Sequence, residues 1–226
     1  MNVEIIFEDD HIIAVNKPNN VLVHHSYYSR NITDDSLLQL LRKQNLGKLY
    51  PIHRLDRKTS GIIILAKQKE EVNQYQTLFI ENQIKKTYHA LVRGHILEQN
   101  SIDSPVKNDL GKYKSALTHY RPLKNYTLDI PVKPYPQSRY TLVEYTPKTG
   151  RMHQLRIHSN KIAHPIIGDH RYGNRHHNRM FEEQLKLPNL FLHAIKLEFI
   201  CPFDEQLIVI RAEKPNFWNQ FLALSE

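Results

Sequence analysis

The chain has 226 residues, of which 40% are hydrophobic, which is enough for one well-packed domain. It has no apolar run near the roughly 20 residues that a membrane helix needs. The acidic segment Met1–Asp10 also lacks the apolar region of a secretory signal. A single cysteine, Cys201, excludes an internal disulfide framework and suits a reducing compartment, so the composition predicts a cytoplasmic protein.

The net charge is +8, from 31 basic and 23 acidic residues, and the isoelectric point is about 9.4. Such a balance is compatible with a polyanionic partner, because Lys and Arg displace counterions from phosphates. A basic enzyme without a nucleic-acid role would have the same composition. The charge alone leaves both interpretations open.

Short strands and two helices are predicted in the first part of the chain. Val3–Glu8 and His11–Lys17 are rich in β-forming residues, and the apolar run Ile62–Ala66 predicts a strand buried on both faces. The first helix is expected to begin at Asp34 or Asp35 and to end at Gly47. Its apolar residues are Leu37, Leu38, Leu40 and Leu41. A second helix has its inner face at Val72, Tyr75, Leu78 and Phe79.

The second part of the chain predicts more strands, a long loop and two helices. The strands are Lys86–Arg93, Ala116–Tyr120, Tyr140–Tyr145, Phe191–Ile200 and Gln206–Arg211. Lys124–Ser138 is rich in Pro and Tyr and predicts an irregular loop. A helical stretch with Arg151, Leu155 and Arg156 follows Thr149-Gly150, and Pro215 begins a last helix. The pattern predicts one α+β domain with a largely antiparallel sheet.

The most informative segment is His53–Gly61, with the sequence HRLDRKTSG, which leads into the buried strand at Ile62. Asp56 lies among basic side chains, and their charge favours its carboxylate form. A carboxylate held in such a loop can act as a nucleophile or general base. A surface Asp in a turn gives the same pattern, and the residues alone favour that simpler interpretation.

The motif HRLDxxTSG resembles the catalytic loop of the RluA-type pseudouridine synthases. Other segments resemble elements of that family in the same order, and together they span about residues 3–211. They are Asp10–Pro18 with its Asn-Lys-Pro, Lys86–Gly94, Thr149–His158 as TGRxHQLRxH, Ala163–Asp169 as HPIxGD, and Phe191–Ala194. The resemblance implies an enzyme that isomerises a chosen uridine in RNA to pseudouridine.

The resemblance also implies the fold of that family, an α+β fold with a mixed, mostly antiparallel central sheet, flanking helices and a central cleft. We expect a single catalytic domain over residues 1–226. We expect no N-terminal S4-like RNA-binding domain, because the first predicted strand begins at Val3. One departure is Asn19-Asn20, where the family more often has Ser-Gly or Ala-Gly. That turn is expected to be remote from the catalytic motif and to leave activity unaffected.

The resemblance implies three catalytic residues. Asp56 is expected to attack the ribose C1′ or to start elimination towards a glycal, and the sequence does not choose between these routes. Arg156 is its expected cationic partner, while Arg151 is a second candidate or a phosphate contact. Tyr88 is expected to stack on the flipped base, although a tyrosine packed in the core is the alternative.

Further substrate contacts are expected from Arg54, His53, Arg151 and Leu192. Arg54 can fill the gap left by the extruded base or lie along the surface, and Leu192 can line the base pocket or belong to the core. Basic residues including Lys85, Lys86, Arg93 and Arg171 are candidates for phosphate contacts or are ordinary surface charges. The isomerisation needs no cofactor, and the histidine spacing with one cysteine predicts no metal.

Within the family, the chain most resembles the enzyme that modifies position 65 of certain tRNAs. The features are the strand Ser115–Tyr120, the Pro-rich insertion and the basic stretch Tyr172–Arg179. Ribosomal RNA, or both RNAs, is an alternative substrate. A non-catalytic RNA-binding protein is a third hypothesis, against which the intact set of Asp56, Tyr88 and Arg156 argues. We expect a monomer that binds RNA and no membrane.

Overall fold

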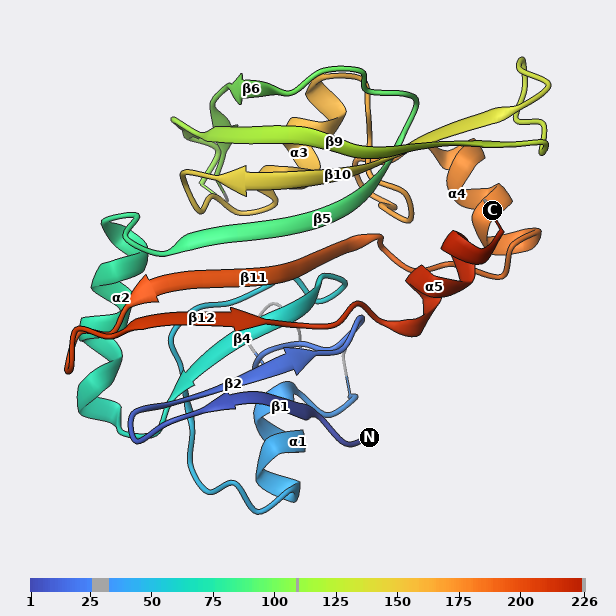
Figure 1. The fold of residues 1–226 in the computed structure, drawn as a ribbon. Coiled ribbons are helices and arrows are strands. Elements are labelled where there is room, and N and C mark those ends of the chain that lie inside the picture. Colours follow the sequence, from blue (N-terminus) through green and yellow to red (C-terminus); the bar gives the residue numbers. More distant parts are fainter. Residues whose placement is uncertain (26–32, 109, 225–226) are drawn as a thin grey trace. The chain divides into compact units, whose positions relative to one another are not determined.

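The computed structural model describes residues 1–25, 33–108 and 110–224, and its elements are drawn in Figure 1. The strands are β1 Glu4–Glu8, β2 Ile12–Lys17, β3 Tyr50–Pro51, β4 Ser60–Ala66, β5 Lys85–Arg93, β6 Asn100–Asp103, β7 Val106–Lys107, β8 Tyr113–Lys114, β9 Leu117–Leu128, β10 Ser138–Pro147, β11 Leu192–Ile200 and β12 Leu207–Arg211. The helices are α1 Leu37–Lys43, α2 Val72–Ile80, α3 Gln154–Lys161, α4 Arg175–Glu183 and α5 Asn216–Ala223, with a short 3₁₀ helix, η2, at Lys69–Glu71. This confirms the α+β class.

The chain forms two compact units. Unit 1 contains Met1–Lys85 and Ala194–Lys214, and unit 2 contains Lys86–His193 and Pro215–Glu226. The chain therefore passes from one unit to the other within β5 and returns within β11. The single catalytic domain and the central cleft stay predictions. Within the described ranges, no helix is long and apolar enough to cross a membrane.

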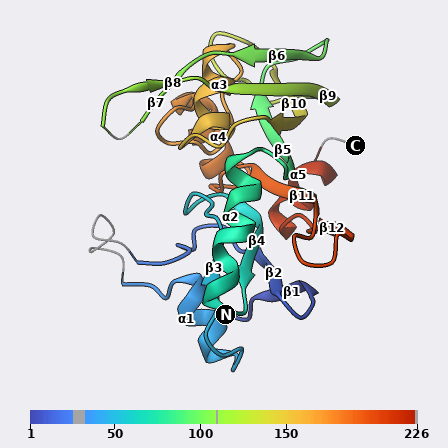
Figure 2. The same cartoon turned by 90° about the vertical axis from the view of Figure 1, so that its left-hand side faces the viewer.

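The sheet of unit 1 has the order β1-β2-β4-β11, with β3 paired to β4 and β12 paired to β11. Every residue of β4 is buried, which confirms the strand predicted from the apolar run. In Figure 2, α2 lies in front of β4. Its Tyr75 is fully buried among Ile12, Ile64 and Phe199, so the predicted inner face of this helix is also confirmed.

The sheet of unit 2 has the order β5-β10-β9-β6, and its registers are antiparallel. Alternate residues of its strands supply two separate cores. Ala90 packs in the first core of unit 2 with Leu155 from α3. Leu91 packs in the second core of unit 2 with Phe181 from α4 and Trp218 from α5. The last helix begins at Asn216, directly after its N-cap Pro215, so the predicted start is one residue early.

Helix α1 corrects two predicted boundaries. Its N-cap is Ser36 rather than Asp34 or Asp35, because Gln39 Oε1 accepts a hydrogen bond from the Ser36 N–H at 2.9 Å. The helix ends at Lys43 with Gln44 as its C-cap, and Asn45, two residues before the predicted stop at Gly47, takes a positive φ of 62°.

The predicted irregular loop Lys124–Ser138 is only partly irregular. Its first residues continue β9, where Tyr126 and Leu128 bury their side chains in the second core of unit 2. Pro122, which has no N–H, lies at the register shift between β9 and β10, so the strand tolerates it. Arg151 precedes α3 rather than lying in it, and the sequence did not predict α4, β6, β7 or β8.

Replacement of Gly61 by Ala is expected to lower the free energy of unfolding by about 3 kcal/mol or more. Gly61 has a φ of 111°, and a Cβ there would overlap the backbone of Ala194 in β11. Urea unfolding followed by circular dichroism measures the loss. Gly47→Ala is the matched control, because Gly47 has a φ of 70° but no neighbour within 4 Å, so strain alone should cost about 1 kcal/mol. Equal losses in the two variants would contradict the role of the close approach.

Candidate active site

Asp56 lies in a tight turn of unit 1 between β3 and β4. The Thr59 N–H donates to the Asp56 carbonyl at 3.1 Å, which closes the turn. Leu55 is buried and anchors the turn on the core, whereas the Asp56 side chain is half-buried. The turn therefore holds a carboxylate near the surface on a fixed backbone, as the motif predicted.

His53 fixes the start of this turn. Its Nε2 accepts a hydrogen bond from the Ile64 N–H at 3.0 Å, and its ring stacks on Phe79 of α2 with 4.5 Å between centroids. Through these contacts His53 links the turn to β4 and α2, a role that the sequence did not predict. Its predicted contact with substrate stays a prediction, as does that of Arg54, whose side chain is exposed.

Lys17, at the end of β2, is buried and holds the Asp56 turn through a hydrogen bond to the residue after Asp56. Its Nζ donates to the carbonyl oxygens of Pro18, Val21 and Arg57 at 2.9, 2.9 and 3.0 Å. Burial lowers the pKa of Lys17 to about 7, while the charge of Asp56 raises this pKa and that of Arg57 lowers it further. The three carbonyl acceptors favour the ammonium form. Lys17 thus ties the residue after Asp56 to β2.

The resemblance gave Lys17 no role beyond the Asn-Lys-Pro element. The available signal was a lysine at the end of a largely apolar strand, IIAVNK. A charged residue there needs a full set of partners, because an unpaired buried charge is costly. Such a lysine is therefore a candidate for holding a loop.

The Asn19-Asn20 turn is not remote from the catalytic motif, and that prediction was wrong. The Asn19 side-chain amide donates to the Lys58 carbonyl, and Arg57 Nε donates to the Asn20 carbonyl at 3.2 Å. The cause is the antiparallel pairing of β2 with β4, which brings the segment after β2 and the segment before β4 to the same end of the pair. The departure from the family pattern therefore touches the Asp56 loop.

Tyr88 and Leu192 contribute to the first core of unit 2. Tyr88 lies in β5 opposite Tyr145 and is half-buried beside this core, and Leu192 is buried within it. Both side chains therefore have a packing role. Their predicted roles against a flipped base stay predictions.

Arg156 projects from α3 and binds Asp169. Its Nε donates to Asp169 Oδ2 at 2.7 Å and its Nη2 donates to Oδ1 at 2.9 Å. Burial alone would raise the pKa of Asp169, but the hydrogen bonds and charge of Arg156 outweigh this effect and hold the pKa below its usual value. The sequence did not predict this partner. The pairing of Arg156 with Asp56 stays a prediction.

Arg151 is exposed and lies just before α3. Its N–H donates to Gln154 Oε1 at 3.0 Å, and its Nε donates to the Ser115 carbonyl at 3.1 Å. The Gln154 side chain also accepts from Thr149 Oγ1 at 2.7 Å, which folds the TGRxHQ segment into the start of the helix. An exposed guanidinium held in this way can contact a phosphate.

The histidines act mainly as hydrogen-bonding groups where their contacts are described. His158 bridges Thr118 Oγ1 and the Ser104 carbonyl at 2.9 and 2.8 Å, and burial lowers its pKa. Burial lowers the pKa of His177 to about 4, and this ring binds the Tyr140 hydroxyl at 2.9 Å. Among the residues that the structure describes, no three or more His, Cys, Asp or Glu side chains are placed to hold a metal ion.

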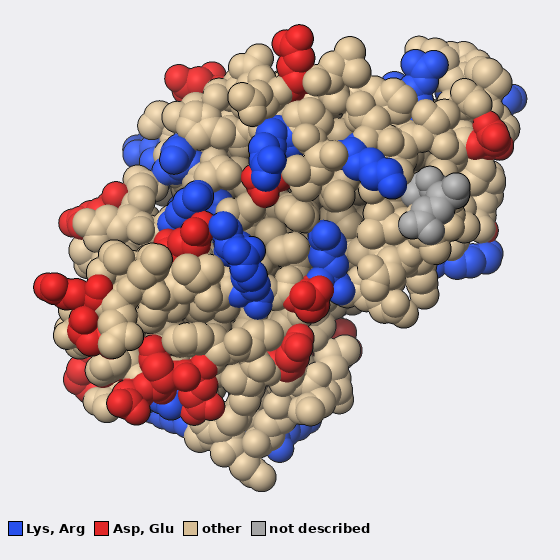
Figure 3. All heavy atoms as spheres, in the orientation of Figure 1, with Lys and Arg blue, Asp and Glu red and all other residues tan. Residues whose placement is uncertain are grey.

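Basic side chains lie beside acidic ones on the face shown in Figure 3, so this face is not a continuous basic patch. One candidate phosphate contact needs correction. Lys86 is only 6% exposed, and burial lowers its pKa, so it is not a surface cation. The positive field expected from the other basic residues stays a prediction.

The chain is similar to known proteins over nearly its whole length. A family model described as RNA pseudouridylate synthase matches residues 11–161. tRNA pseudouridine synthase C of Vibrio vulnificus is 40% identical, with 96% of this chain and 93% of that protein covered. The protein of the same name from Pasteurella multocida is 40% identical, with 96% and 94% covered. The solved structure of human RNA Pseudouridylate Synthase Domain Containing 4 has a TM-score of 0.74 at 26% identity, with 98% of this chain and 92% of that chain covered.

Replacement of Lys17 by Met is expected to lower the free energy of unfolding by about 1–3 kcal/mol, because the carbonyls it binds lose their donor. The pH dependence has a definite sign. The pKa in the folded state is about 7 and the usual value is 10.5, so the unfolded state binds more protons between these values. The stability of the unsubstituted protein relative to Lys17→Met should therefore rise from about pH 7 to about pH 10.5. Denaturant unfolding across this range measures it.

The control is Lys67→Met, which removes a partly exposed ion pair with Glu8 in the same unit. This change is expected to cost at most about 1 kcal/mol. A Lys17→Met protein as stable as the unsubstituted one at every pH would contradict the structural role of the buried amino group.

Proposed function

We propose that the substrate of this enzyme is tRNA and that Asp56 is its catalytic residue. The chain belongs to the RNA pseudouridylate synthase family and is an RluA-type enzyme that isomerises uridine to pseudouridine. The observation that carries the substrate is the 40% identity, over 96% of this chain, to a tRNA pseudouridine synthase C. We extend the proposal to position 65 of the tRNA. The proposal also includes a monomer in the cytoplasm.

The local structure of unit 1 supports the role of Asp56. The Thr59 N–H donates to the Asp56 carbonyl, and Lys17 donates to the carbonyl of the next residue. His53 holds the start of the turn by accepting from the Ile64 N–H. Reactive groups need such a fixed position, because small displacements from the productive geometry cost large factors in rate. The half-buried side chain also stays accessible to a nucleotide.

The reaction rearranges bonds within one nucleotide. The bond from N1 to the ribose C1′ breaks, the base turns, a bond from C5 to C1′ forms, and the C5 proton is lost while N1 gains one. Asp56 starts the reaction at the ribose, by attack on C1′ or by elimination. No electrons are gained or lost overall, so the task of the protein is to position the nucleotide and to stabilise charge.

The other proposed residues serve the same nucleotide. Tyr88 stacks on the extruded base, and base–aromatic stacking contributes about 1–3 kcal/mol against the cost of extrusion. Arg156 stabilises the Asp56 carboxylate. Arg54 and Arg151 are exposed and contact the RNA backbone or the vacated helix position, while His53 and Leu192 complete the substrate contacts.

Asp56→Asn is expected to lower tritium release from C5-tritiated uridine in tRNA by at least about 10³-fold, because the amide is a poor nucleophile and base. The amide is isosteric, so the dissociation constant for tRNA should change little. Asp35→Asn, which removes an exposed carboxylate paired with Lys43, is the control and should retain full release. Release by Asp56→Asn at the unsubstituted rate would refute the assigned role.

The substrate is tested with purified enzyme and two RNAs, a tRNA transcript and a ribosomal RNA fragment. Pseudouridine is expected in the tRNA alone. A tRNA with cytidine at position 65 and a compensating change in its stem partner should release no tritium. Modification of the ribosomal fragment at an equal rate would replace the tRNA proposal with a dual or ribosomal substrate, while leaving the reaction unchanged.

A further inference from the structure

Asp169 is a buried carboxylate with several hydrogen bonds that the proposed mechanism does not use. Its side chain is 1% exposed, and its two oxygens accept four hydrogen bonds. Two come from Arg156, and the others come from the backbone N–H groups of Arg171 and Tyr172 at 2.9 and 3.0 Å. A carboxylate with this many donors has one available position, so it is a rigid reference point for the arginine.

We infer that Asp169 is a positioning residue that fixes the guanidinium of Arg156 for catalysis. The inference rests on the proposed function, in which Arg156 stabilises the Asp56 carboxylate. The ion pair uses the Nε–Nη2 edge of the planar fork, so it sets both the plane and the direction of the group. A guanidinium has a further edge besides this one, and in the proposed mechanism that edge serves Asp56.

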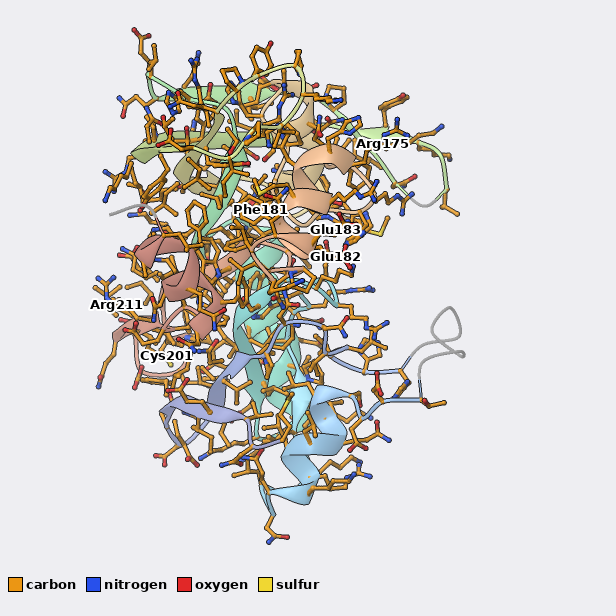
Figure 4. All side chains as sticks on the ribbon, turned by 90° about the vertical axis from the view of Figure 1, so that its right-hand side faces the viewer. Arg175, Phe181, Glu182, Glu183, Cys201 and Arg211 are labelled. Atoms are coloured by element: carbon orange, nitrogen blue, oxygen red, sulfur yellow. The ribbon has the colours of Figure 1, made fainter. Side chains whose placement is uncertain are left out.

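The position of Asp169 is itself set by helix α4. Asn178, buried in α4, donates through Nδ2 to the Asp169 carbonyl at 2.9 Å and accepts through Oδ1 from the Gly168 N–H at 2.9 Å. The helix is marked in Figure 4 by Arg175, Phe181, Glu182 and Glu183. Phe181 packs in the second core of unit 2, so the loop that carries Asp169 is tied to that core.

An aromatic ring supports the guanidinium from a second direction. The carbon of the Arg156 guanidinium lies 5.2 Å from the centroid of the Tyr172 ring. The Tyr172 hydroxyl in turn binds His153 Nδ1 at 3.1 Å, just before α3. The carboxylate fixes the edge of the guanidinium and the ring contacts it as a cation, so the group has little freedom to tilt.

The donor geometry of a guanidinium allows two carboxylates to share one arginine. The pKa of Asp169 lies below its usual value, so Asp169 is ionised at neutral pH and compensates the cation. An arginine offers five N–H donors in a fixed fork and can bind two carboxylates at different edges. A lysine offers a single point charge without that geometry.

The test is a double-mutant cycle of Asp169→Asn and Arg156→Lys in the full chain, measured as tritium release from tRNA. Asp169→Asn alone is expected to lower kcat by about 10²-fold, because a misplaced catalytic group costs about that factor, with KM within about threefold. In the Arg156→Lys background, Asp169→Asn should cause almost no further loss, because the group that it positions has been removed. A merely structural role would lower activity equally in both backgrounds.

Glu144→Gln is the control, since it removes the carboxylate of another arginine pair in unit 2, with Arg121 at 2.7 Å, and should retain full kcat. If Asp169→Asn does not fold, Asp169→Glu takes its place in the cycle, because it keeps the charge but shifts the carboxylate by one methylene. Full kcat in the Asp169 variant, full kcat in Arg156→Lys, or equal losses in both backgrounds would overturn the inference. Activity in Asp56→Asn would instead refute the proposed function, so the two failures are distinguishable.

Discussion

A buried ammonium group beneath the Asp56 turn is the interaction on which the candidate site of unit 1 depends. Lys17 is fully buried, and its three acceptors come from its own strand end and from the residue after Asp56. A buried cation tolerates only arrangements that supply its acceptors, so the carbonyl groups of both segments must point inward. The pairing of β2 with β4 places the two segments together, and Lys17 then determines how the turn lies on them.

Unit 2 applies the same principle with the opposite charge. Asp169 is a buried anion whose donors come from Arg156 and from two backbone N–H groups of its own loop. The loop is fixed because the Asp169 carboxylate needs the backbone N–H donors of this loop. The position of Arg156 is fixed because its guanidinium binds that carboxylate. In each unit, a charged residue that is away from solvent thus determines the position of a residue that the proposed mechanism places at the substrate.

The predictable parts of the structure were those in which a local pattern decides the outcome. The apolar run of β4 and the spacing around Tyr75 in α2 gave these elements because burial governs them directly. The cap of α1 was misplaced because three consecutive cap-forming residues compete, and the distance to Gln39 selects Ser36. Helix α4 has a mostly polar sequence, RHHNRMFEE, and its helical state depends on burying Met180 and Phe181 in a core built by other elements.

The residues of the candidate site also divide into those that a local sequence pattern predicts and those that only the fold reveals. The Asp56 motif is contiguous in sequence, whereas Lys17 and Asp169 gain their roles only through register and loop packing. Apolar side chains of similar volume often replace a buried ion pair with no loss of stability, or with a gain. Stability alone therefore does not account for the buried pair of Arg156 and Asp169. An apolar side chain could not direct three carbonyls towards the Asp56 turn or hold a guanidinium by one edge. The proposed mechanism requires both, because it works by placing charge rather than by transferring electrons.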